Sequence, residues 1–173
     1  MKTHLGDDAY KLALLHPRTQ QLKVSIEPES PDQPEVIRLI HELEACQRPL
    51  YPAGSRPRVD AAALAGSTGL FVVAREKAGR AIGCCAIVFK VDYAEIKRMF
   101  VRVQYRGQGV GTALLSFVES HAIGSGFSEL RLEANVLQPE ALAICVRAGY
   151  TQRAASADCP LDPLRVFMQK SVH

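Results

Sequence analysis

The spacing of apolar residues divides the chain into strand-like and helix-like segments. Alternating or continuous apolar runs predict strands at residues 22–28, 69–76, 81–91, 94–103, 128–135, 150–153 and 164–170. Apolar residues recur at helical spacing in three other segments, 31–47, 109–126 and 138–149. Gly149 directly follows the last of these helical runs, where a glycine favours the end of a helix.

The order of these segments predicts a fold of the α/β or α+β class. Short polar turns separate the strands at 69–76, 81–91 and 94–103, which is typical of an antiparallel meander. A helix then leads to a further strand, so one crossover connection follows the meander. We expect residues 1–21 to form a loosely attached extension and residues 22–173 to form a single domain. One or two helical turns are also expected at residues 59–66.

Composition excludes several classes of function. A net charge of +3 without a dense Lys/Arg run gives no support for nucleic-acid binding. The longest apolar run is too short to span a bilayer, and the first residues lack the pattern of a signal peptide. Five cysteines without a Cys-x-x-Cys spacing indicate neither a disulfide framework nor a metal site. We therefore expect a reduced, cytoplasmic protein that binds no metal and no membrane.

Three glycines alternate with other residues between the last strand of the meander and the next helix. The first N–H groups of a helix have no partner within the helix, and glycines let an anion approach the backbone closely. This pattern predicts an anion cradle with Arg106 supplying positive charge. Its backbone groups come from Gly107, Gln108, Gly109, Val110, Gly111 and Thr112.

Other interpretations of this loop remain open at this stage. It lacks the lysine of a Walker phosphate loop, and a dinucleotide fingerprint fails because Thr112 stands where the third glycine belongs. Glu133 nevertheless follows at the spacing of a ribose-binding acid, which leaves a nucleotide-binding domain as one alternative. A tight glycine-rich turn without any ligand is another.

Residues 106–111 fit the Arg/Gln-x-x-Gly-x-Gly/Ala signature, and the chain resembles the GCN5-related N-acetyltransferases over residues 22–171. The segments at 94–115 and 130–153 are similar to consecutive elements of that family. The resemblance implies a mixed, mostly antiparallel sheet of six to seven strands that splays between the fourth and fifth strands. It also implies acetyl transfer from acetyl-CoA to a primary amine of a small molecule or peptide, by direct attack in a ternary complex. A homodimer is expected from the family, and a non-catalytic module that binds or senses acyl-CoA is the alternative.

The resemblance also implies which residues contact acetyl-CoA. Backbone groups of Phe100, Val101 and Val103 would pair with the pantetheine arm, as an added strand pairs with a sheet edge. Gln138, Ala141 and Cys145, in the helical segment 138–149, would close the far wall of the slot. The diphosphate would lie on the glycine loop.

Two carboxylates are candidates for the base that deprotonates the amine. Glu133 lies where several family members carry a base, and Glu95 begins the strand that would line the same floor. The alternative for each is a structural ion pair with a neighbour such as Lys97 or Arg131.

The sequence departs from the family pattern at the position of the general acid. Cys145 stands where the family often has a tyrosine, and the sequence leaves three roles open for it: acid, packing residue, or carrier of an acetyl group. As an acid, its sulfur would lie close to that of CoA. Tyr51, Arg56 and Arg58 are candidates for acceptor binding because they lie in a Pro-rich segment that overhangs the acceptor side in this family.

Overall fold

The computed structural model of the protein describes residues 22–50, 68–155 and 162–173. The predicted extension at 1–21, the predicted helical turns at 59–66, and the acceptor candidates Tyr51, Arg56 and Arg58 lie outside the described residues.

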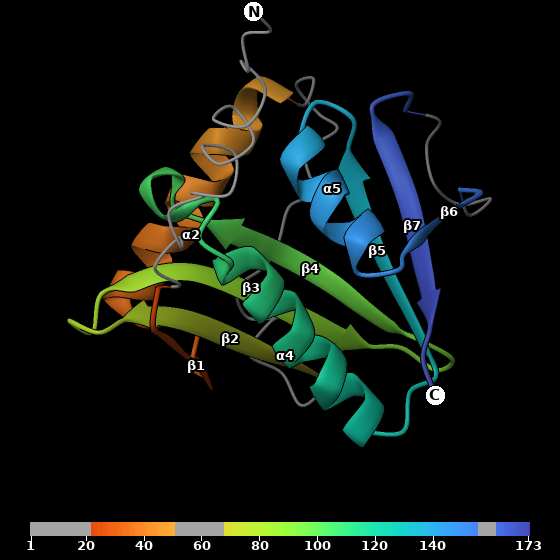
Figure 1. The fold of residues 1–173 in the computed structure, drawn as a ribbon, viewed down its shortest axis with the longest axis horizontal. Helices are drawn as coiled ribbons and strands as arrows, with labels where there is room; N and C mark the ends of the chain where they lie inside the picture. The colour runs from red at the N-terminus through yellow and green to blue at the C-terminus, as the bar shows by residue number, and fades with distance from the viewer. Residues whose placement is uncertain (1–21, 51–67, 156–161) are drawn as a thin grey trace, which may run out of the picture.

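The described strands form one mixed sheet (Figure 1). Their order in the sheet is β1-β2-β3-β4-β5-β7-β6, and every neighbouring pair is antiparallel except β4 and β5. The strands are β1 (Val24–Pro28), β2 (Gly69–Glu76), β3 (Ala81–Phe89), β4 (Ala94–Val101), β5 (Glu129–Asn135), β6 (Thr151–Arg153) and β7 (Arg165–Ser171). The predicted meander, the crossover after the glycine loop and the predicted fold class are confirmed. The expectation of one crossover is incomplete, because β5 and β6 are both antiparallel to β7 and therefore parallel to each other, so α5 forms a second crossover.

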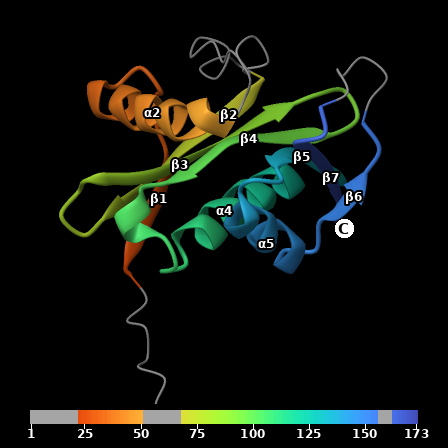
Figure 2. The same cartoon turned by 90° about the horizontal axis from the view of Figure 1, so that it is seen from above.

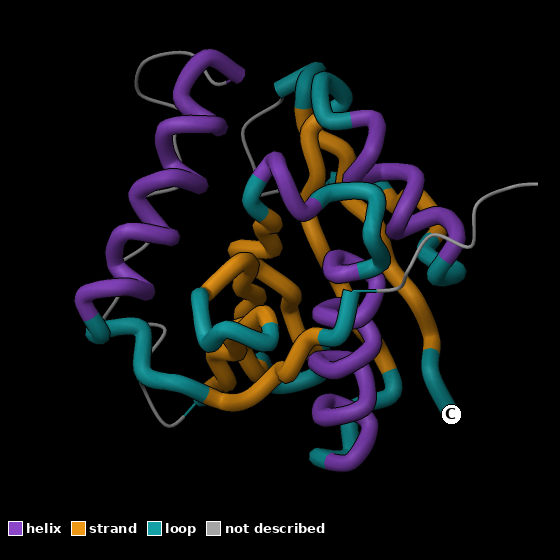
Figure 3. The backbone as a smooth tube through the Cα atoms, turned by 60° about the vertical axis from the view of Figure 1, so that its left-hand side comes forward, coloured by secondary structure: helices purple, strands orange, loops and turns teal. Residues whose placement is uncertain are grey.

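Within the described residues, three helices cover the two faces of the sheet (Figures 2 and 3). One face carries α2 (Pro34–Gln47), and the opposite face carries α4 (Val110–Gly124) and α5 (Pro139–Arg147). The α2 helix begins with a proline in its first turn, and Gly149 beyond α5 has a φ of 91°, which a glycine adopts without strain.

Each face has its own apolar core. Leu39 and Leu43 of α2 pack with Val73 and Phe100 on one face. On the other face, α4 buries Leu114 and its neighbours against alternate residues of β2, β3, β4 and β5. The period of two along the strands and of 3.6 along the helices therefore separates the two cores, as the apolar pattern predicts.

A β-bulge interrupts β4 at Arg98 and Met99. Cys84 pairs with Phe100 and Ala86 pairs with Lys97, so Arg98 and Met99 together lie opposite the single residue Cys85. Arg98 has a φ of 57°, in the left-handed region that a residue with a side chain rarely adopts.

The bulge exchanges the two faces of β4 along the strand. Ile96 belongs to the core under α4, and strict alternation would also place Arg98 and Phe100 on that face. Instead, Phe100 packs in the core under α2, and Arg98 approaches Glu44 of α2 at 3.8 Å. Met99 and Val101 pack against the opposite core. The extra residue of the bulge accounts for this change.

The two parallel strands diverge at the bulge. Pairing between β4 and β5 covers Ala94–Ile96 and Leu130–Leu132, and no further pair between these two strands is found among the described residues. Farther along, β4 continues against β3 and β5 continues against β7. The splay expected between the fourth and fifth strands therefore begins at Ile96 and Leu132.

Candidate functional site

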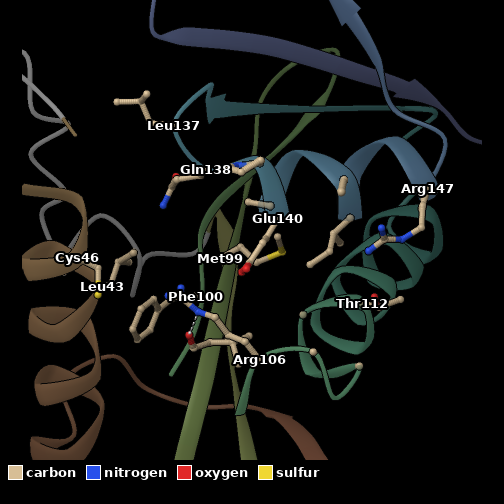
Figure 4. A pocket seen from close by; sticks show the side chains of 18 of the residues that line it. Leu43, Cys46, Met99, Phe100, Arg106, Thr112, Leu137, Gln138, Glu140 and Arg147 are labelled. Carbon is tan, nitrogen blue, oxygen red and sulfur yellow. Dashed lines mark hydrogen bonds between the residues drawn. The ribbon is translucent and has the colours of Figure 1, made fainter. Parts of the chain in front are cut away.

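A cavity of about 1020 Å³ opens where β4 and β5 diverge. Figure 4 shows α2 on one side of it, α5 above it, and the start of α4 at its far end. The residues that line it come from α2 and its C-terminal turn (Leu43, Cys46, Leu50), β4 (Met99, Phe100, Val101), the glycine loop and α4 (Arg106, Gly107, Gly109, Gly111, Thr112), and the turn and helix after β5 (Leu137, Gln138, Pro139, Glu140, Ala141, Ala143, Ile144, Arg147).

The glycine loop presents open backbone amides to this cavity. Gly107 and Gly109 have φ angles of 71° and 84°, which a glycine adopts without strain. Gly109 is the N-cap residue of α4, where no side chain caps the helix. The first bond of the helix runs from the Ala113 N–H to the Gly109 carbonyl oxygen at 3.0 Å, so the preceding amides lie before the hydrogen-bonded helix. This geometry fits an anion at the positive end of the α4 dipole.

The residues between the glycines contribute their backbone more than their side chains. The Val110 side chain is buried in the core. Gln108 donates its side-chain amide to the Gln104 carbonyl oxygen at 3.1 Å. A Cβ on Gly111 would lie 3.1 Å from Ile144 Cδ1, so a glycine here lets α4 and α5 approach each other closely.

Arg106 lies over the slot that the pantetheine arm is expected to use. Its Nε donates to the Val101 carbonyl oxygen at 3.0 Å, and its guanidinium carbon lies 5.9 Å from the centre of the Phe100 ring. The arginine therefore brings positive charge to both the glycine loop and the exposed edge of β4.

Two of the three predicted pantetheine contacts line the cavity, and the third does not. Phe100 and Val101 lie on the cavity wall. Val103 does not line it, because β4 ends at Val101 and Val103, which is 64% exposed, begins a 3₁₀ turn. Its contact with the pantetheine arm stays a prediction. Met99 also lines the cavity, because the bulge turns it to that face of β4.

The α5 helix supplies the expected wall and two charged residues that the sequence interpretation missed. Gln138 and Ala141 line the cavity as expected. Glu140 and Arg147 also line it, and in Figure 4 both extend from the underside of α5. Their spacing of seven residues is two helical turns, a signal that was present in the sequence. It places a carboxylate at one end of the wall and a guanidinium at the other.

The α2 side of the cavity is apolar, and the sequence interpretation missed it. Leu43, Cys46 and Leu50 line this side, and Figure 4 places Leu43 and Cys46 beside Phe100. The spacing of 43, 46 and 50 follows one face of a helix, but the sequence alone does not show which part of the sheet that face meets.

The base candidate Glu133 lies on the sheet near other charges. Arg165 Nε lies 3.5 Å from its Oε1. Burial raises the pKa of Glu133, and the nearby Arg165 and Lys97 only partly oppose this effect. A carboxylate with a raised pKa is suited to accept a proton near neutral pH. The Glu133 side chain does not line the cavity.

The other base candidate, Glu95, is held in an ion pair. Its Oε1 lies 3.0 Å from Lys97 Nζ on the same face of β4. This is the structural alternative that the sequence left open, and Glu95 does not line the cavity either.

Cys145 is brought to the core rather than to the cavity. It is 2% exposed and packs in the cluster beneath α4. Burial raises the pKa of the thiol to about 11, with a smaller contribution from the charge of Glu119. This position fits the packing role better than that of an acid, because the neighbouring residues Ala143 and Ile144 line the cavity in its place.

Neither a metal-binding cluster nor a membrane-spanning helix is found among the described residues. Residues 22–50, 68–155 and 162–173 contain no cluster of three or more His, Cys, Asp or Glu side chains that could hold a metal ion. Within the same ranges, no helix combines the length and apolar character needed to cross a membrane.

Comparison with known proteins gives consistent matches. Residues 36–150 match the model of a family described as the acetyltransferase (GNAT) family. The chain is 39% identical over 149 residues to a protein of Azospirillum brasilense named IAA acetyltransferase, covering 85% of this chain and 97% of that protein.

Solved structures share the fold. A structure described as an acyl-CoA N-acyltransferase, from Klebsiella pneumoniae, is 34% identical with a TM-score of 0.73, covering 87% of this chain and 98% of that one. The PaiA N-acetyltransferase of Thermoplasma acidophilum, solved in complex with coenzyme A, is 17% identical with a TM-score of 0.70, covering 87% of this chain and all of that one (100%).

Proposed function

The chain belongs to the acetyltransferase (GNAT) family and is an N-acetyltransferase, and we propose that it acetylates a primary amine of a small molecule or peptide. One observation carries the proposal: a single cavity joins the open amides of the glycine loop to the diverging edge of β4. An anionic group at one end and an acyl thioester near the bulge would use both features. The structure with coenzyme A among the fold neighbours supports this use of the slot.

We propose that the amides of residues 107–112 donate to the diphosphate of acetyl-CoA. Arg106 and Arg147 supply positive charge on either side of these amides. The edge of β4 at Phe100 and Val101, which β5 leaves unpaired, pairs with the amide groups of the pantetheine arm, and Arg106 releases the Val101 carbonyl oxygen for this pairing. This arrangement directs the thioester toward Met99 and the bulge.

The acceptor enters from the α2 side in this proposal. Leu43, Cys46 and Leu50 offer it an apolar wall, so we expect an amine that carries an apolar group close to the nitrogen. IAA is tested separately beside the amines, because a relative is named for it.

The chemistry requires a base and a donor to the developing oxyanion. Glu133 accepts the proton of the amine through water, because its side chain does not line the cavity, and its raised pKa favours this role. A backbone N–H near Val101 donates to the carbonyl oxygen as the amine nitrogen attacks. The carbon–sulfur bond then breaks, and the departing thiolate takes the proton that the attacking nitrogen loses as it becomes the amide nitrogen.

Thiol release from acetyl-CoA across a panel of amines tests the function. Intersecting initial-velocity lines for the two substrates are expected for a ternary complex, whereas parallel lines would contradict direct attack. Binding of CoA without turnover on any amine would support a non-catalytic module instead.

Three matched substitutions identify the base. Glu133→Gln is expected to lower kcat/KM by about 10²–10⁴-fold and to remove the acid limb of the pH profile. Glu95→Gln and Glu129→Gln serve as controls, because neither residue lines the cavity, and each should change kcat/KM by less than about threefold. An unchanged profile for Glu133→Gln would eliminate this residue as the base.

A further inference from the structure

The side chain of Asn135 lies where the two diverging strands leave a gap. Asn135 is the last residue of β5 and is completely buried, with 0% of its surface exposed. On one side, it pairs with Arg165 of β7. On the other side, the pairing with β4 has already ended at Leu132. A buried amide at this point must find its hydrogen bonds away from β4.

Asn135 finds these partners on two different walls of the cavity. Its Oδ1 accepts the backbone N–H of Leu137 at 2.8 Å, and its own carbonyl oxygen accepts the N–H of Gln138 at 2.9 Å. Its Nδ2 donates to the carbonyl oxygen of Leu50 at 3.4 Å. Leu50 follows α2, whereas Leu137 and Gln138 lead into α5, and all three residues line the cavity.

Only a side-chain amide of this length can make both contacts. The oxygen of Asn135 closes the turn after β5, and its NH₂ group provides the donor that the Leu50 carbonyl accepts. An aspartate keeps the oxygen but has no donor when it is ionised. A serine keeps a short oxygen that closes a similar turn, but it is one bond shorter and lacks the NH₂ group.

We propose that Asn135 is a positioning residue that bridges the α2 wall and the α5 wall and so sets the width of the acyl-CoA slot. This inference rests on the proposed function, because it assigns the slot to acyl-CoA. The bridge joins the end of β5 to the turn after α2, beyond the point where β4 and β5 stop pairing. If the slot already has its bound width in the free protein, less conformational entropy is lost when the ligand binds.

Calorimetric titration of CoA into wild type, Asn135→Asp and Asn135→Ser tests the bridge. Each variant is expected to bind CoA about tenfold more weakly, since each keeps an oxygen for Leu137 and loses the donor to Leu50. Amide exchange at Leu137 should change little in both variants. Wild-type affinity in a folded variant would overturn the proposal.

A core substitution away from the cavity separates positioning from ordinary destabilisation. Ile87→Val lowers stability in β3, where Ile87 is 1% exposed and does not line the cavity. It should leave the CoA dissociation constant within about twofold of wild type at a temperature where the protein is folded. Equal weakening in Ile87→Val would assign the effect to stability rather than to the bridge.

A measurement on the wild type needs no substitution. The side-chain NH₂ protons of Asn135 should exchange slowly with solvent, and more slowly still with CoA bound. Rapid exchange in both states would contradict the bridge. Absence of CoA binding by the wild type would instead refute the proposed function.

Discussion

The two halves of β4 serve different purposes. In the first half, Ala94–Ile96 pairs with β3 on one edge and with β5 on the other, over a closed apolar core. In the second half, the bulge at Arg98 and Met99 turns the strand away from β5, and the residues from Met99 to Val101 line a cavity. One strand thus provides both a stable centre for the sheet and an open edge for a ligand.

The cavity between β4 and β5 depends on the irregular backbone of β4 at the bulge. Thiol groups of β3 contact this irregular segment: Cys84 Sγ lies 3.5 Å from the Arg98 carbonyl oxygen, and Cys85 Sγ lies 3.8 Å from that of Lys97. Burial raises the pKa of Cys84 to about 12, so this thiol stays protonated and can donate. Stability and binding should therefore respond to different substitutions in the two halves.

The largest expected effect is a loss of folding stability from a substitution beside the first half of β4, where β4 and β5 are paired. Leu130 lies opposite Ala94 and is 0% exposed. Leu130→Ala should lower the free energy of unfolding by about 2–5 kcal/mol, because it removes buried contacts and leaves a cavity. Urea denaturation measures the loss, and the CoA affinity of the folded variant should stay within about twofold of wild type. A loss in affinity as large as the loss in stability would erase the distinction between the halves.

A smaller effect is expected at the open end, where glycine substitutions offer a matched pair. Gly107 and Gly79 have φ angles of 71° and 85°, and a Cβ on either would meet no heavy atom within 4 Å. Alanine should cost about 1–2 kcal/mol at each position through backbone strain. Only Gly107→Ala should also weaken CoA binding, by about tenfold, because Gly79 lies in the distant turn between β2 and β3. Equal CoA affinities for the two variants would show that the glycine loop does not contact CoA.

The smallest effect is a pH dependence of stability from Glu133. Its pKa lies above the ordinary value of 4.5, so the folded protein holds this proton more tightly than the unfolded chain. Stability therefore falls as the pH rises from about 4.5 through the raised pKa. Glu133→Gln should melt slightly higher than wild type near pH 8 and equally near pH 4. The same substitution that lowers turnover would thus raise stability.

Glu29 provides a control of opposite sign for this experiment. Hydrogen bonding to Arg75 lowers the pKa of Glu29, so its contribution to stability is present above about pH 4.5 and is lost in more acidic solution. Glu29→Gln should therefore melt lower than wild type near pH 8. A shift of the same sign in both variants would show that the burial of Glu133 is not what controls its titration.

Much of the site could be predicted because it depends on local pattern. The glycine spacing before a helical run was enough to predict an anion cradle, since the required φ angles and open amides arise within a few consecutive residues. Gln138 and Ala141 followed from the resemblance to the family. The charged pair Glu140 and Arg147 could have been found from helical spacing alone.

The parts that were missed depend on contacts between distant segments. Val103 was assigned to the strand because its pattern continues the alternation, but the strand ends at Val101. The sequence left Cys145 open between acid, packing residue and carrier of an acetyl group, and only the rotation of α5 shows that it lies in the core. The two consecutive charged residues Lys97 and Arg98 break the alternation of β4, which in retrospect is the sequence signal of the bulge.

The sequence by itself determined the order of the elements, the class of the fold and the backbone geometry of the glycine loop. These follow from side-chain periodicity and from the φ angles that only glycine adopts freely. The tertiary structure alone decided how far β4 and β5 stay paired, which wall α2 supplies, and how Asn135 comes to lie near Leu50, 85 residues away. The reason is physical: these features depend on how separate elements pack, and no short stretch of sequence contains both partners.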